Sequence, residues 1–224
     1  MTSVLLNARR FYQALKSLLA LVGLAALAAY FALPQLPTMP LAAGLPSFAP
    51  VAPAAAAAAE LPTALAEAAL EREQEAVAEY IARRYRIADN AATHFVSIAY
   101  RAAEQHRLDA LLVLAVMAIE SRYNPVAESV MGAKGLMQVI PKYHQEKLFE
   151  HGGDEALLEP EVNIQVGAQI LREYQRRFGD IETALQMYAG ALDEPTSQYA
   201  NKVFAEKARL DALRFKVRKT GQSV

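Results

Sequence analysis

The pattern of hydrophobic positions predicts helices along the chain from residue 62 onward. Val77, Ile81 and Tyr85 recur at four-residue spacing among Glu and Arg residues, and an apolar stripe resumes at residues 95–99. This spacing predicts two amphipathic helices that join near Asp89-Asn90. No segment shows the alternation of a half-buried strand, and no internal repeat is visible. The predicted fold class is therefore all-α.

The next predicted helix is apolar on every side. Asp109 is a suitable N-cap residue, and nine apolar residues follow it at 111–119. Such a helix must be buried, and it has to end before Asn124-Pro125, because the residue before a proline is kept out of the helical region. Further helices are predicted at 139–149, from Pro160 to a stop at Gly179, at 181–188 and at 199–215.

The amino-terminal segment has the pattern of an export signal or a membrane anchor. Residues 18–33 are 16 uncharged and mostly apolar positions, and Arg9, Arg10 and Lys16 precede them. A helix of that length spans about 24 Å, short of a hydrocarbon core of about 30 Å, so anchor and cleavable signal both stay open, with an uncleaved anchor favoured. The basic residues place the rest of the chain outside the cytoplasm. We therefore expect a transmembrane helix or signal peptide within 1–33.

A linker is expected to follow at residues 34–60. Residues 34–59 hold six prolines, end in a run of six alanines and carry no charge. Proline-rich chain is extended, at about 3.1 Å per residue, and acts as a spacer.

Composition excludes several classes of function. The chain has 224 residues, with 23 Lys and Arg against 24 Asp and Glu, so no overall field attracts nucleic acid. It has no cysteine, which rules out a disulfide framework and a thiol nucleophile. The histidines show no ligand spacing with acids, so neither a metal nor another cofactor is expected; they are His94, His106, His144 and His151.

The residue with the clearest chemical signal is Glu120, which comes directly after the nine apolar residues. A carboxyl group at the end of a buried helix is poorly solvated, and desolvation raises its pKa. A carboxylic acid that stays protonated near neutrality can act as a general acid. The alternative is a structural glutamate that pairs with Arg122 or caps backbone amides.

The residues around Glu120 favour the catalytic interpretation. The run Ala118-Ile119-Glu120-Ser121-Arg122-Tyr123-Asn124-Pro125-Val126-Ala127-Glu128-Ser129 is followed by Gly132-Ala133-Lys134-Gly135-Leu136-Met137-Gln138 and later by Asn163-Ile164. This ordered set resembles the catalytic domain of the soluble lytic transglycosylase (SLT) family, of the lysozyme-like superfamily. The resemblance covers roughly residues 92 to 210. It implies a lysozyme-like helical domain with Glu120 as the catalytic acid and base.

The resemblance also implies roles for nine neighbours, each with a simpler structural alternative such as backbone capping, turn geometry or core packing. The implied substrate-binding residues are Ser121, Ser129, Met137, Gln138, Tyr188 and Tyr199. Structural support is implied for Gly132, Gly135 and Asn163. One element departs from the family pattern Ala-Tyr-Asn-Ala-Gly, because this chain reads Gln186-Met187-Tyr188-Ala189-Gly190. Either two residues are replaced there or one is missing.

The function expected from the resemblance is a peptidoglycan lytic transglycosylase. It would cleave the β-1,4 bond between N-acetylmuramic acid and N-acetylglucosamine, leave 1,6-anhydromuramic acid ends and need a single carboxyl group. The alternatives are a hydrolytic muramidase and a non-catalytic peptidoglycan-binding scaffold. We expect the protein on the periplasmic side of the inner membrane, with a helical lead-in at 61–107, the catalytic domain at 92–212 and a basic tail at 213–224.

Overall fold

The computed structural model describes residues 54–221, with side chains from Leu65 onward. The predicted membrane segment at 1–33 and most of the predicted linker lie outside this range. Within 54–221, no helix is long and apolar enough to cross a membrane.

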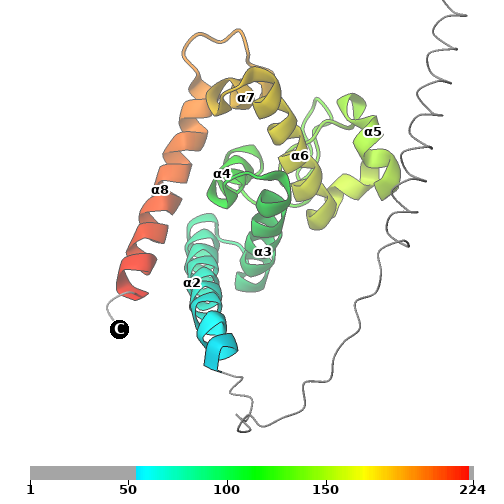
Figure 1. The fold of residues 1–224 in the computed structure, drawn as a ribbon. Coiled ribbons are helices and arrows are strands. Elements are labelled where there is room, and N and C mark those ends of the chain that lie inside the picture. Colours follow the sequence, from blue (N-terminus) through cyan, green and yellow to red (C-terminus); the bar gives the residue numbers. More distant parts are fainter. Residues whose placement is uncertain (1–53, 222–224) are drawn as a thin grey trace, which may run out of the picture. The chain divides into compact units, whose positions relative to one another are not determined.

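Helices make up most of the described chain (Figure 1). The α-helices are α2 (Ala54–Tyr85), α3 (Asp89–His106), α4 (Ala110–Glu120), α5 (Gln145–Leu148), α6 (Pro160–Phe178), α7 (Ile181–Tyr188) and α8 (Gln198–Gly221). The 3-10 turns are η1 (Pro141–Tyr143), η2 (Phe149–His151) and η3 (Asp154–Leu158). Residues 54–221 contain no strand, only isolated bridges that join Lys134 to Glu128 and to Val139. The all-α prediction is confirmed for this part of the chain.

The boundaries of the first two helices differ from the predicted ones. The break between them lies at 86–88, just before the predicted join, and Arg86 has a φ of 59° there. Helix α2 begins at Ala54, so the alanine run that the sequence placed in the linker is helical. Alanine has the highest helix propensity, and a run of it extends a helix that is already nucleated downstream.

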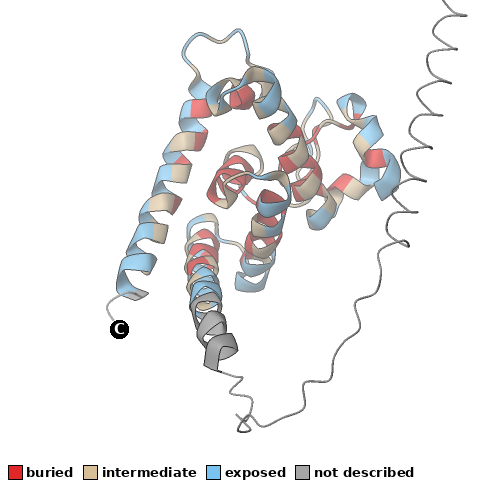
Figure 2. Ribbon diagram, in the orientation of Figure 1, coloured by how far each residue is buried: buried red, intermediate tan, exposed pale blue. Residues whose placement is uncertain are grey.

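Helix α4 is the centre of the core, as predicted. The Asp109 carboxylate caps it by accepting a hydrogen bond from the Leu111 amide at 3.0 Å. Every residue from 111 to 118 is buried. Its closest neighbours are α8 and α3, and the buried positions in Figure 2 concentrate on α4 and on the faces turned toward it. The helix ends at Glu120, four residues before Asn124.

Two further predictions needed correction. The predicted helix at 139–149 is broken into η1, α5 and η2, because Pro141 opens a new turn and the residues that follow make only short hydrogen-bonded runs. The predicted helix at 199–215 is longer, because α8 runs from Gln198 to Gly221 and includes most of the predicted basic tail at 213–224. Helices α6 and α7 have the predicted limits, and Gly179 caps α6 with a φ of 86°.

Asp109 also ties α4 to α8. Lys207 Nζ lies 2.7 Å from Asp109 Oδ2, and Arg214 approaches Oδ1 at 3.4 Å. Burial alone would raise the pKa of Asp109, but the hydrogen bonds from Lys207 and Leu111 and the two positive charges outweigh it and lower that pKa. The stabilisation is therefore present above the ordinary carboxyl pKa and is lost as pH falls.

We predict that Asp109→Ala lowers the free energy of unfolding by about 1–2 kcal/mol, because it removes the N-cap of α4 and a charge partner of α8. Asp109→Asn keeps a capping oxygen and should recover roughly half of that loss. Urea denaturation at neutral pH measures both. Equal losses in the two variants would show that the cap contributes nothing.

Candidate active site

Glu120 lies at the carboxyl end of α4, where the buried surface of the helix meets solvent. Burial raises its pKa from the ordinary 4.5 to about 7, and a hydrogen bond from Tyr199 partly offsets that rise. Near neutral pH the group therefore exchanges readily between carboxylic acid and carboxylate. The direction of this pKa shift is the one that the sequence predicted, and the role of Glu120 as an acid stays a prediction.

Tyr199 is the direct partner of Glu120. It lies in the first turn of α8, and its hydroxyl donates a hydrogen bond to Glu120 Oε1 at 2.5 Å. Burial and the nearby Glu120 raise the pKa of Tyr199 well above its ordinary range, so the phenol stays a donor. Two residues 79 positions apart in the sequence are joined in this way.

Tyr188, at the end of α7, is the second tyrosine beside Glu120. Burial is the main cause that raises its pKa well above the ordinary value, and the charge of Glu120 raises that pKa further. Its hydroxyl donates to the carbonyl oxygen of Met137 at 2.8 Å. This hydrogen bond joins Tyr188 to the backbone of the loop that follows Glu120 in the sequence.

The loop from Ala127 to Gln138 is held against α4 by side chains that the sequence singled out. Ser121 Oγ donates to the carbonyl oxygen of Leu136 at 2.7 Å. Gln138 Nε2 lies within hydrogen-bonding distance of the carbonyl oxygens of Ala127, at 3.1 Å, and Gly135, at 3.0 Å. Gln138 itself has a φ of 50°, a left-handed conformation that turns the chain sharply.

Asn163 supports this loop from α6. Its side chain is fully buried, its Oδ1 accepts from the Met137 amide at 2.7 Å, and its Nδ2 donates to the carbonyls of Lys134 and Leu157, both at 2.8 Å. Gly135 makes this approach possible, because a Cβ atom there would lie 2.2 Å from Asn163 Nδ2. Both residues thus occupy supporting positions.

Met137 and Ser129, two residues predicted to bind substrate, contact other parts of the protein. Met137 is completely buried. Its sulfur packs so tightly on Gly167 that a Cβ atom added to Gly167 would lie 2.6 Å from that sulfur. It has no surface in this structure to offer a sugar ring. Ser129 Oγ accepts from the Met131 and Ala133 amides, at 3.3 and 3.0 Å. It closes the turn in which Gly132 takes a φ of 78°.

A groove of about 430 Å³ is lined by Gln138, the last residue of the loop at 127–138, and by Tyr188, while Glu120 is not among its lining residues. Three more lining residues belong to the segment that departs from the family pattern, namely Met187, Ala189 and Gly190. The sequence did not predict the remaining lining residues, because they come from separate elements and carry no shared motif. They are Val139, Ile140, Tyr143, His144, Ile170 and Tyr174. Burial and nearby Lys147 lower the pKa of His144, which keeps it neutral. The lining combines apolar and aromatic surface with a few polar groups, as in small-molecule sites.

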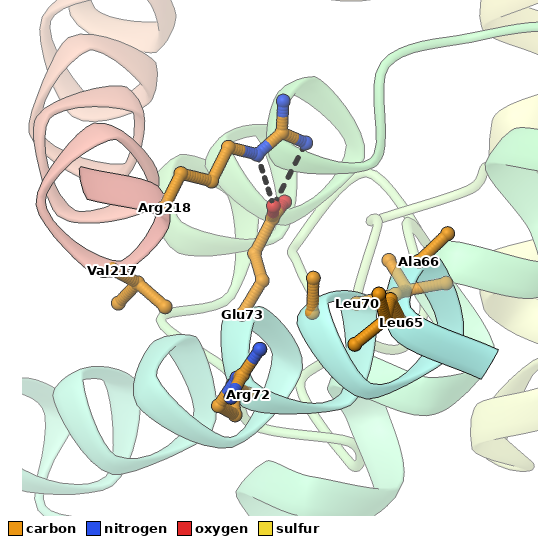
Figure 3. Close-up of a pocket in the computed structure, with 8 residues that line it drawn as sticks. Leu65, Ala66, Leu70, Arg72, Glu73, Val217 and Arg218 are labelled. Carbon is orange, nitrogen blue, oxygen red and sulfur yellow. Dashed lines mark hydrogen bonds and ion pairs between the residues drawn. The ribbon is translucent and has the colours of Figure 1, made fainter. Parts of the chain in front are cut away.

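The described chain has another cavity apart from this site. A cavity of about 560 Å³ between α2 and α8 is lined by none of the residues of the Glu120 motif (Figure 3). Among residues 54–221, no group of three or more His, Cys, Asp or Glu side chains could hold a metal ion.

A comparison with models of protein families identifies the family of this chain. The family model for the transglycosylase SLT domain matches residues 95–209, just over half of the chain, and the match includes Glu120, Asn163 and Tyr199. The chain belongs to this family.

Individual relatives match the same region. The chain is 37% identical over 107 residues to a transglycosylase of Enterobacteria phage PRD1, covering 46% of this chain and 38% of that one. It is 39% identical over 72 residues to the soluble lytic murein transglycosylase of Salmonella typhimurium, covering 30% and 11%. It is 31% identical over 116 residues to membrane-bound lytic murein transglycosylase C of Sodalis glossinidius, covering 49% and 30%. The chain thus spans well under half the length of each.

Two solved structures are similar to the chain. They are lytic transglycosylase Slt of Pseudomonas aeruginosa and a soluble lytic transglycosylase of Escherichia coli, each with 21% sequence identity. The TM-scores are 0.47 and 0.41. The matches cover 51% and 63% of this chain, and 23% and 28% of the two structures.

The raised pKa of Glu120 predicts a pH-dependent cost to folding. Because the folded value of about 7 lies above the ordinary 4.5, Glu120 favours the folded state at low pH and loses that contribution as pH rises from 4.5 through 7. As pH rises from 4 to 8, the free energy of unfolding of Glu120→Gln should therefore increase relative to that of the wild type, by on the order of 2 kcal/mol. Urea denaturation across this range checks it. A stability difference that does not change with pH would contradict the raised pKa.

Proposed function

We propose that this protein is a peptidoglycan lytic transglycosylase. It cleaves the β-1,4 bond between N-acetylmuramic acid and N-acetylglucosamine and leaves a 1,6-anhydromuramic acid end, with Glu120 as the only acid and base. Membership of the SLT family and the names of the murein-acting relatives support the substrate class.

The observation that carries the proposal is the half-buried Glu120, whose pKa is raised to about 7. As a carboxylic acid it donates its proton to the glycosidic oxygen while that bond breaks. The resulting carboxylate then takes the proton from the 6-hydroxyl of the muramic acid as that oxygen bonds to the anomeric carbon. The Tyr199 hydroxyl, 2.5 Å away, stabilises the carboxylate between these two steps.

The surroundings of Glu120 favour ring closure over attack by water. Glycosidases that use water pair two carboxyl groups, about 5–5.5 Å apart in retaining enzymes and about 6.5–9.5 Å apart in inverting ones. A second carboxylate that close would raise the pKa of Glu120 by repulsion, yet burial is the only cause that raises it in the described chain. Glu128, the nearest acid in the motif, is exposed. A nucleophile already present in the substrate removes the need for an activated water.

The groove beside Gln138 and Tyr188 is the proposed binding site for the glycan strand. Tyr143, Tyr174 and Met187 offer apolar surface for pyranose faces, and backbone and amide groups offer hydrogen bonds to hydroxyl and acetamido groups. We further propose that Tyr188 corresponds to the family tyrosine and that one residue is missing after it. Its hydroxyl on the Met137 carbonyl, beside Glu120, supports that choice.

We place the enzyme on the periplasmic side of the inner membrane. The uncharged stretch at 18–33, with basic residues before it, supports export or anchoring. The proline-rich segment that follows would let the catalytic domain reach the wall. A membrane-bound relative is consistent with this location.

The test is mass analysis of soluble products after the full-length protein digests peptidoglycan sacculi. We expect anhydro-muropeptides, lighter than hydrolysed ones by one water molecule. Glu120→Gln should lower their yield by about 10²- to 10⁴-fold, the usual contribution of a general acid. Glu128→Gln, which changes an exposed acid of the same motif, is the matched control and should keep full activity.

Other outcomes would overturn the proposal. Hydrated reducing ends would identify a muramidase. Binding of sacculi without any release, by wild type and variants alike, would identify a non-catalytic scaffold.

A further inference from the structure

Two buried carboxylates lie outside the active site, and both connect α2 to α8. Glu73 of α2 and Glu206 of α8 each have side chains that are 3% exposed. Each accepts a hydrogen bond from a tyrosine and pairs with arginine. The family match begins at residue 95, so α2 lies before it. This raises the question of what α2 does for the catalytic residues.

The Glu206 cluster is the one nearer the active site. Tyr85, the last residue of α2, donates its hydroxyl to Glu206 Oε1 at 2.7 Å. Arg84 approaches the same oxygen at 3.3 Å, and Arg209 binds the other at 2.5 Å. Burial and the hydrogen bond to Glu206 raise the pKa of Tyr85 to about 12, so it remains a donor at any physiological pH.

The same tyrosine also contacts the chain that follows Glu120. The rings of Tyr85 and Tyr123 meet edge to face with centroids 4.8 Å apart, and the Arg122 guanidinium lies 5.9 Å from the Tyr85 ring. Arg122 and Tyr123 have φ values of 54° and 65°, a conformation that non-glycine residues keep only when their surroundings hold them. Tyr123 is buried, and its hydroxyl donates to the Leu114 carbonyl of α4 at 2.9 Å.

Tyr85 therefore braces both partners of the Glu120 hydrogen bond. Through Tyr123 it contacts the turn that begins directly after Glu120. Through Glu206 it holds α8 at a position seven residues, about two helical turns, beyond Tyr199. Residues at that spacing lie on the same face of a helix, so Glu206 and Tyr199 both turn toward the interior.

We propose that Tyr85 is a positioning residue for the active site: through Glu206 and Tyr123 it keeps the Tyr199 hydroxyl on the Glu120 carboxyl group. Helix α2 is then a working part of the catalytic unit. The importance of this arrangement for turnover rests on the proposed function. The arrangement itself can be tested without an activity assay, through the pKa of Glu120.

The direct measurement is an NMR titration of the Glu120 carboxyl carbon in the full-length protein. The groups that act on it are Tyr199 of α8 and Tyr188 of α7. Because the Tyr199 hydrogen bond lowers the pKa of Glu120, Tyr199→Phe should raise that pKa by about one pH unit. Tyr85→Phe, which removes only the hydroxyl on Glu206, should raise it by part of that amount. The double variant should match Tyr199→Phe alone.

The chain provides a matched control in the second cluster. Tyr100 donates to Glu73 Oε1 at 2.8 Å, and Glu73 pairs with Arg218 at 2.9 Å. Figure 3 shows the pair of Glu73 and Arg218. Arg218 is 19 residues beyond Tyr199 on α8, more than five helical turns away. Tyr100→Phe therefore removes an equivalent buried hydroxyl and should lower thermal stability to a similar extent, but leave the pKa of Glu120 unchanged.

A purely structural role for Tyr85 would give a different pattern. Tyr85→Phe would then lower the melting temperature and leave the titration of Glu120 at its wild-type position, which would overturn the proposal. An equal rise in Tyr100→Phe would also overturn it. If Tyr85→Phe does not fold, Glu206→Gln tests the same link and should also raise the pKa of Glu120. Failure of the proposed function would show separately, as wild-type protein that releases no anhydro-muropeptides.

Discussion

The burial of α4 is the constraint on which the rest of the structure depends. Nine apolar residues leave this helix without a polar face, so it lies among α3 and α8 at the centre of the core. Its last residue is a glutamate, which is consequently withdrawn from water, and its pKa is raised to about 7. The raised pKa of Glu120 thus follows from the same apolar run that organises the fold.

Helix α8 holds both ends of α4. At the start of α4, Lys207 pairs with the capping Asp109 at 2.7 Å, and at its end Tyr199 binds Glu120 at 2.5 Å. A third contact, between Glu206 and Tyr85, joins α8 to α2. A buried acid needs defined partners to keep one geometry, because an unpaired polar group in the interior is costly. Here the hydrogen-bond partner of Glu120 is Tyr199 of α8, so this bond depends on how α8 packs.

Local signals in the sequence predicted the helices and the N-cap at Asp109, because each depends on residues close together in the chain. They also predicted that burial raises the pKa of Glu120. The motif also indicated Asn163 and Tyr199, although only the fold shows that one braces a loop and the other binds Glu120. Tyr85 gave no comparable signal, since its partner Glu206 is 121 residues away. Met137 matched the motif, yet burial against Gly167 removes it from any surface.

The central claim is that one buried carboxyl group suffices because the substrate supplies its own nucleophile. Digestion of sacculi in water enriched in heavy oxygen tests this directly. If the 6-hydroxyl of the muramic acid attacks, the new glycan ends form without water and carry no heavy oxygen. If instead each new end carries a heavy oxygen atom from the moment of cleavage, water is the nucleophile, and a second base must act beside Glu120.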